Sequence, residues 1–372
     1  MRYPIQVWLP LVLNHHRTCL VSRIFSEHRI SSCADGWPSF KDHHGQGLSP
    51  RFVDQYELQL FDAFRILNPG IPKGSEAFEE AWQHYLAQEG GKDHGNWVFY
   101  PWLNTCVRVL DEWLFQQVRL SRNMHKISQE EQAVLQKKTV AIIGLSVGQS
   151  AAVTLAMEGT ASTLRLADFD TLDLSNLNRL RAGVHQIGER KTRLAARAIV
   201  EINPYATIEL FEEGATPENL KELLFGADVL LEECDALPIK IMARLAAKQL
   251  GIPVIMDTSD RGMLDVERFD LEPNRQLFHG LAGEINEATI QSLTPQSALE
   301  LMMAVVDYPS VSERLKSSYA EMGKTLVSWP QLAFEVMAGG AHAAEATRRI
   351  LLNQAMPSGR YYLELLPENS NR

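Results

Sequence analysis

From Thr139 to Met256 the sequence alternates short apolar runs with helical stretches, and this alternation most limits the possible folds. The first run, Thr139–Ile143, is β-branched and ends at Gly144, which is typical of a strand buried on both faces. Strands and helices that alternate at this spacing form parallel pairs through right-handed crossovers. The pattern therefore predicts an α/β fold with a doubly wound, Rossmann-like, mainly parallel sheet.

The same periodicities divide the chain into four parts. Further strands are expected at 164–167, 208–211, 229–231 and 254–256, and helices at 148–158, 191–202, 218–224 and 239–250. Before the sheet, aromatic and aliphatic side chains recur at helical spacing in 54–67 and 76–89. We therefore expect an irregular, mobile segment at 1–53, a helical N-terminal module at 54–118, the sheet domain at 119–293 and a mainly helical C-terminal segment at 294–372.

Charge and hydropathy exclude several classes of protein. The formal net charge of -10 gives no overall attraction for nucleic acid or for an anionic membrane surface. No apolar run approaches the length of a membrane span, and the stretch from Trp8 to Leu13 is too short and interrupted for a signal peptide. We therefore expect a cytoplasmic protein with no nucleic acid or membrane partner.

The cysteines are scattered and form no C-x-x-C pair. They are Cys19, Cys33, Cys106 and Cys234. This spacing argues against a zinc ribbon and against a disulfide framework, and it fits a reducing compartment. The histidines His15, His16, His28, His43 and His44 follow no ligand spacing together with the nearby cysteines, so no metal site is expected there.

A loop with two glycines follows the first strand of the predicted sheet. Gly144 and Gly148 lie at the turn into the next helix, where backbone N–H groups and the helix dipole can receive a phosphate. Asp168 ends the second strand about twenty residues later, where a ribose hydroxyl would be bound. Two glycines alone also fit a tight turn without a ligand, but together with Asp168 they predict a nucleotide site.

The segment after the second strand carries a more specific pattern. It reads DFDTLDLSNLNR at 168–179, and Lys191 then opens a helix that ends before Asn203-Pro204. This run resembles the ThiF/MoeB group of adenylating enzymes, the bacterial relatives of ubiquitin-activating enzymes. Their pattern is D-x-D-x-V-x-x-S-N-L-x-R-Q, followed by a lysine and an N-P pair. The resemblance covers about 119–280 and implies an ATP-binding adenylation domain at 119–293.

The resemblance implies a role for each matching residue. Arg179 and Lys191, with Asn176 as a neutral donor, would contact the phosphates of ATP, since a triphosphate requires converging cations and donors. Asp168 would bind the ribose, and Asp170 belongs to the same nucleotide site. The two loop glycines would allow the backbone to approach the nucleotide closely. Without this context, Arg179 or Lys191 would ordinarily be interpreted as an exposed charge on the solvated face of a helix.

Two flanking motifs extend the resemblance. RLSRN at 119–123 is similar to the family's R-Y-x-R-Q, whose second arginine reaches the ATP of a partner subunit. This implies Arg122 as an arginine finger and a homodimer, with a surface arginine as the alternative. LLEECDA at 230–236 matches V-L-D-C-T-D-N and implies Asp235 as the ligand of Mg²⁺. The sequence departs from the family at Leu180, Glu232 and Ala236, where Gln, Asp and Asn are usual.

Polar residues after the fifth strand lie at the same carboxyl edge of the predicted sheet. Asp257, Asp260 and Arg261 are candidates for the lining of a substrate channel, with turn and capping residues as the alternative. No cysteine follows Asp235, so we expect neither the thioester relay nor the zinc of many relatives. Cys234 is expected to be a small buried residue at a strand end rather than a nucleophile.

The residues and the resemblance together predict an ATP-dependent adenylyltransferase. Such an enzyme activates a carboxylate, in the family the C-terminus of a ubiquitin-like or sulfur-carrier protein or a peptide, as acyl-AMP and releases pyrophosphate. A weaker resemblance from Glu233 to Pro273, to ThiF-type domains fused to a flavin nitroreductase, implies a separate flavin reductase as a partner. Two alternatives stay open: a catalytically silent nucleotide-binding scaffold or sensor, and an NAD-dependent oxidoreductase.

Overall fold

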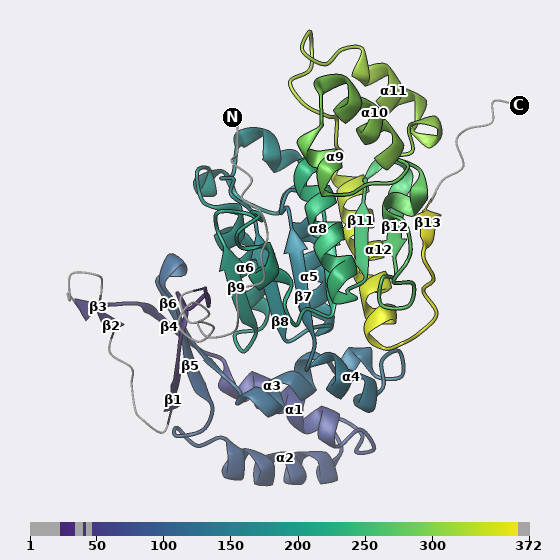
Figure 1. Ribbon diagram of the computed structural model, residues 1–372. Helices are drawn as coiled ribbons and strands as arrows, with labels where there is room; N and C mark the ends of the chain where they lie inside the picture. The colour runs from purple at the N-terminus through teal and green to yellow at the C-terminus, as the bar shows by residue number, and fades with distance from the viewer. Residues whose placement is uncertain (1–22, 34–39, 42–46, 364–372) are drawn as a thin grey trace, which may run out of the picture.

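The computed structural model describes residues 23–33, 40–41 and 47–363. A seven-stranded sheet forms its largest layer, with the strand order β13-β12-β11-β10-β7-β8-β9 (Figure 1). The strands are β7 (Thr139–Ile143), β8 (Thr163–Ala167), β9 (Thr207–Phe211), β10 (Val229–Glu232), β11 (Val254–Asp257), β12 (Met263–Glu267) and β13 (Gly359–Tyr362). The five strands from β7 to β11 pair in parallel, whereas β12 and β13 pair antiparallel at one edge.

Helices cover both faces of this sheet. On one face α5 (Gly148–Glu158), α6 (Lys191–Ile202) and α12 (Ala333–Leu351) share a buried core with Val140 and Ile142. On the other, α7 (Leu220–Leu224), α8 (Leu237–Leu250) and α10 (Pro295–Val305) share a core with Ala141 and Ile143. Successive side chains of a strand point to opposite faces, which explains why the run at β7 is apolar throughout.

The predicted α/β class with its mainly parallel sheet is confirmed. Helices α5 and α6 have the predicted bounds, and β8 to β11 differ from their predicted ranges by one residue at one end. The antiparallel β12 was not predicted. It turns back from β11 through Ser259 (φ 62°) and Arg261 (φ 53°), two non-glycine residues in the left-handed region. The turn therefore lacks the Asn-Gly or Asp-Gly signal by which a hairpin is recognised.

The structure corrects the expected organisation of the first 118 residues. The N-terminal module has the helices α1 (Tyr56–Leu67), α2 (Glu76–Glu89) and α3 (Glu112–Arg119), but it also has a four-stranded sheet of order β1-β5-β6-β4. Its strands are β1 (Arg29–Ser32), β4 (Arg51–Asp54), β5 (Asn96–Tyr100) and β6 (Thr105–Val109). The module is thus mixed rather than helical, because its aromatic run Trp97–Tyr100 is a strand buried on both faces. Likewise β1 and all but the last residue of β4 lie within 1–53, which is not irregular throughout.

Both ends of the described chain join the large sheet. Phe25 N donates to Ile208 O (2.8 Å), so the chain before β1 lies along the β9 edge. At the opposite edge β13 pairs with β12, and α12 packs along α5. The described part of the predicted segment 294–372 therefore shares the core of the predicted domain 119–293. No helix among the described residues is both long and apolar enough to span a membrane.

The remaining elements are short. They are β2 (Phe40–Lys41), β3 (Gly47–Leu48), α4 (Gln129–Leu135), α9 (Glu287–Gln291) and α11 (Glu313–Tyr319). The apolar stretch Trp8–Leu13 and the residues His15, His16, Cys19, His43 and His44 lie outside the described residues. Within those ranges, no group of three or more His, Cys, Asp or Glu side chains is arranged to hold a metal ion.

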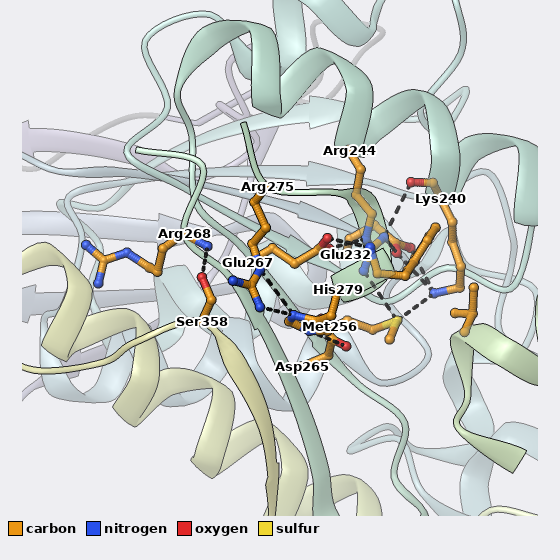
Figure 2. Close-up of polar contacts among 12 residues, drawn as sticks. Glu232, Lys240, Arg244, Met256, Asp265, Glu267, Arg268, Arg275, His279 and Ser358 are labelled. Carbon is orange, nitrogen blue, oxygen red and sulfur yellow. Dashed lines mark hydrogen bonds and ion pairs between the residues drawn. The ribbon is translucent and has the colours of Figure 1, made fainter. Parts of the chain in front are cut away.

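A network of buried charges joins α8 to β10 and β12 (Figure 2). Arg244 is fully buried, and its Nε donates to Glu267 Oε2 (2.6 Å) while its Nη1 donates to Glu232. Lys240 Nζ binds the same Glu232 carboxylate at 3.1 Å. Burial alone would raise the pKa of Glu232, but the charges of Lys240 and Arg244 lower it to about 2. Glu232 is therefore an ionised structural residue that anchors α8 under the sheet.

Replacing Arg244 by Met should destabilise the fold, because Glu232 and Glu267 would lose a buried cation. We expect Arg244→Met to lower the free energy of unfolding by roughly 3–5 kcal/mol, the usual cost of breaking a buried ion pair. The control is Arg349→Met, which removes an exposed pair with Glu345 and should cost about 1 kcal/mol or less. Equal midpoints of urea unfolding for the two variants would contradict the structural role of Arg244.

Candidate functional site

The two-glycine loop lies where β7 passes into α5, at the carboxyl edge of the sheet. Gly144 adopts φ 88°, and a Cβ there would lie 2.7 Å from the carbonyl carbon and oxygen of Glu233. A Cβ on Gly148 would lie 2.8 Å from Ile142 Cγ2. Both glycines are therefore required by the packing of the loop against β7 and β10. This packing brings the loop beside the end of β10, and Asp235 lies three residues beyond that end.

Asp168 ties the end of β8 to the loop. Its Oδ2 accepts from Leu145 N (2.7 Å) and its Oδ1 accepts from Asp170 N (2.8 Å). Burial raises the pKa of this carboxyl, although both hydrogen bonds favour the ionised form. Because each oxygen receives one hydrogen bond, lone pairs remain that could accept a ligand hydroxyl.

Of the predicted cations and Asn176, Arg179 contacts the loop directly. Arg179 donates from Nε and Nη2 to Ser146 Oγ, at 3.2 and 3.1 Å. Lys191, the first residue of α6, is buried and binds Asp170 Oδ2 at 2.8 Å. Asn176 Oδ1 accepts from the backbone N of Asp173 (3.0 Å) and so caps a short 3₁₀ turn. Each of these side chains thus has a structural partner within the chain.

Asp235 and Arg122 lie at different ends of the domain. Asp235 is exposed just beyond β10, and its negative charge counteracts the burial that lowers the pKa of Arg179. Arg122 is exposed at the far end of α5, where its neighbour Asn123 donates to Glu158 O (2.9 Å). The glycine loop is at the other end of that helix. One chain therefore does not bring Arg122 to the loop, and its role stays a prediction about a second subunit.

A cavity of about 520 Å³ opens beside the loop, between Val147 and the ends of β10 and β11. It is bordered by Asp235 and by the candidate channel residues Asp257, Asp260 and Arg261. Asp260 accepts from Ser312 N (2.8 Å) and Ser312 Oγ (2.6 Å) at the start of α11. Arg261 Nη1 donates to Ser310 O (2.6 Å). Asp260 and Arg261 thus hold the helical wall of the cavity against the sheet edge.

Glu233, which was not predicted as a site residue, is buried at the floor of this cavity. Asp257 N donates to both carboxylate oxygens of Glu233, at 3.1 and 3.2 Å. The Asp257 carboxylate accepts in turn from Ser259 N (3.0 Å) and Ser259 Oγ (3.3 Å). A Cβ on Gly339 of α12 would lie 1.9 Å from Asp257 Oδ2, so the helix backbone closes the floor. The signal that could have revealed Glu233 is a glutamate where the matching family pattern has a cysteine.

The departures from the family pattern have local structural counterparts. Leu180 is buried in a small apolar cluster with Leu172 and Leu194. Ala236 is the N-cap of α8 and makes no side-chain cap bond. Burial and the charge of Glu232 raise the pKa of the Cys234 thiol, so Cys234 is protonated at neutral pH and a poor nucleophile.

The topology defines a Rossmann-like α/β protein, in which the loop after the central strand and the ends of β10 and β11 meet at a change in strand order. A model of the ThiF family matches residues 120–335, more than half of the chain. The chain therefore belongs to the ThiF family.

Three relatives show how far the likeness extends. An uncharacterized protein of Mycobacterium tuberculosis is 43% identical over 317 residues, 85% of this chain and 42% of the relative. The tRNA threonylcarbamoyladenosine dehydratase of Bacillus subtilis is 30% identical over 41% of this chain and 61% of its own. The molybdopterin-synthase adenylyltransferase of Haemophilus influenzae is 26% identical over 57% of this chain and 87% of its own. The chain thus spans less than two thirds of the length of the first two of these relatives.

The stability of the protein should depend on pH through Asp257. Burial raises the pKa of Asp257 to about 7, although the hydrogen bonds from Ser259 lower it. An aspartate in an unfolded chain has a pKa of about 3.9, so the folded state binds the proton more tightly. The proton's contribution to stability is complete below about pH 4 and disappears as the pH rises toward about 7.

We expect the free energy of unfolding to fall by roughly 1–3 kcal/mol more in the wild type than in Asp257→Asn between pH 5 and pH 8. Urea titrations at both pH values measure this difference. Glu313→Gln, which removes the charge of a carboxylate whose side chain is 86% exposed, should follow the wild type. Parallel curves for wild type and Asp257→Asn would show that Asp257 titrates normally.

Proposed function

We propose that this chain is an ATP-dependent adenylyltransferase that activates a carboxylate as acyl-AMP. The observation that supports this most is that Arg179 binds Ser146 of the glycine loop and lies close enough to Asp235, which borders the cavity, for the two charges to interact. The Arg179 cation and the available Asp235 carboxylate suit a nucleoside triphosphate with its metal ion. The adenylyltransferase among the relatives supports the same chemistry by its name.

In the proposed reaction, an oxygen of the substrate carboxylate attacks the α-phosphorus of ATP. The bond between the α-phosphorus and the bridging oxygen breaks, and its electrons leave with pyrophosphate. Arg179 and Lys191 offset the negative charge of the phosphates, and Asp168 orients the ribose. Asn176 lies in the same turn as a neutral donor. No protein nucleophile is needed, because the residues act by positioning and by neutralising charge.

Mg²⁺ fits this donor set. Asp235 is exposed at the cavity and has no ion pair within the described residues, so its carboxylate is available. A single carboxylate together with phosphates and water is a common way to bind this ion. Mg²⁺ bound at Asp235 would supply further neutralisation of the triphosphate charge.

The assembly and the substrate are further parts of this proposal. The family resemblance favours a homodimer in which Arg122 reaches the partner's ATP, and a monomer in sedimentation velocity would contradict it. The relatives' names and the resemblance support a carrier-protein C-terminus or a peptide as the first carboxylates to test. A separate flavin reductase is proposed as a partner, and its absence from copurified material would contradict that part.

Removing Arg179 should weaken ATP binding. We expect Arg179→Ala to raise the Kd for Mg-ATP roughly 10- to 100-fold, because a hydrogen bond to a charged group contributes about 1.5–3 kcal/mol. Calorimetry measures the affinity, and Arg181→Ala, which removes an exposed arginine two residues away, is the control. Binding of NADH instead of ATP would favour the oxidoreductase alternative. ATP binding without pyrophosphate exchange on any carboxylate would favour the scaffold.

Asp235 should determine the response to Mg²⁺. In the wild type we expect Mg²⁺ to lower the Kd for ATP about tenfold, and in Asp235→Asn less than about threefold, because the ion loses its protein ligand. ATP titrations with and without Mg²⁺ measure this ratio. Glu218→Gln, which also removes an exposed carboxylate, should keep the wild-type ratio. The same ratio in Asp235→Asn would remove Asp235 from the metal site.

A further inference from the structure

The cavity beside the glycine loop has a floor of acidic groups at the sheet edge, and its mainly aliphatic wall includes three aromatic rings. Five residues with carboxyl groups border it, against three basic residues. Two of those carboxyls, Glu233 and Asp257, lie side by side at the ends of β10 and β11 and are buried. The volume, about 520 Å³, is within the range of small-molecule sites.

The surroundings of Glu233 differ from those of its neighbour Glu232. Glu232 is bound by Lys240 and Arg244. Among the described residues, neither Glu233 nor Asp257 has a basic side chain within ion-pair distance, although both are buried. Their hydrogen bonds come from Asp257 N and from Ser259 instead. A buried carboxyl group is neutralised either by a proton or by a cation, and the cavity gives a cation access from outside.

The wall opposite adds a second feature that suits a cation. Tyr319 of α11 and Trp329 both border the cavity, and their rings meet edge to face with centroids 4.7 Å apart. Aromatic ring faces attract ammonium and guanidinium groups. The aromatic rings of the wall and the acidic floor therefore favour the same kind of ligand.

We propose that the substrate carries a protonated amine close to its reacting carboxylate, and that Glu233 and Asp257 bind this amine. The inference rests on the proposed adenylation and specifies its substrate class. The amine must be close because Glu233 is two residues from Asp235 and both border the same cavity. Two sources supply this chemistry: the α-ammonium group of a free amino acid, and the basic side chain of the last residue of a peptide.

Pyrophosphate exchange with matched probes tests the amine. The free amino acids are compared with their N-acetyl forms, and acetyl-Gly-Gly-Lys and acetyl-Gly-Gly-Arg with acetyl-Gly-Gly-Gly. We expect exchange with an amine-bearing probe, and at least a tenfold higher KM when that amine is acetylated or absent. Preference for a free amino acid identifies the first source, and preference for the peptides with a basic end identifies the second.

Variants of the floor test the residues. Glu233→Gln and Asp257→Asn keep the side-chain shape and should each raise the KM of the amine-bearing probe at least tenfold, with the KM of its neutral partner and the Kd of Mg-ATP changed less than twofold. Glu335→Gln, which removes a carboxyl from the rim of the same cavity, should change these values less than threefold. If a variant does not fold by circular dichroism, the comparison of free and acetylated probes on the wild type still decides.

The outcomes separate this inference from the proposed function. Equal KM values for charged and neutral probes, or exchange by none of them in a protein that binds Mg-ATP, would overturn the amine site and leave ATP binding in place. Unchanged kinetics in both floor variants would also overturn it. Failure to bind Mg-ATP would overturn the proposed function and the inference with it.

Discussion

The parallel pairing of β7 with β10 is the constraint on which the site depends. The chain runs from β7 to β8 and β9 on one side, then returns to β10 and β11 on the other. The loops after β7 and β10 therefore leave the same edge in different directions and form a crevice. Gly144 permits their contact, because any side chain there would overlap the backbone of Glu233. Arg179, Asp168 and Asp235 are all placed relative to this contact.

The parallel core could be predicted because its sequence repeats simple signals. An apolar run such as that of β7 is typical of a strand buried on both faces. The amphipathic pattern of α6 is typical of a helix with one buried face. The N-terminal sheet could not be predicted in the same way, because β1 and β4 are short and become strands only by pairing with β5 and β6. The turn into β12 depends on tertiary contacts that hold Ser259 and Arg261 at positive φ.

The candidate site was predictable to a similar degree. The motif located Asp168, Lys191 and Arg179, but it could not show that each also has a structural partner in the chain. Glu233 carries no pattern of its own, and its importance appears only when β10 and β11 are paired. Long-range pairing of this kind is the part of a site that local sequence does not contain.

Glu232, the last residue of β10, and Glu233, which follows it, have different surroundings. One points into a network where Lys240 and Arg244 compensate its charge fully, and this contributes to a unique packing of α8. The other borders the cavity and has no ion pair with any of the described residues. A buried carboxyl group without an ion pair lowers the stability of the fold. Losses of stability of this kind are common at ligand-binding sites.

The position of α12 bears on how the molecule is assembled during synthesis. Gly339 of this helix closes the floor under Asp257, and β13 then completes the edge beside it. Both follow all the other described elements along the chain, so a ribosome delivers the glycine loop about two hundred residues before the helix that closes the cavity. A nascent chain would thus acquire its glycine loop early and a closed cavity only after α12 has been made.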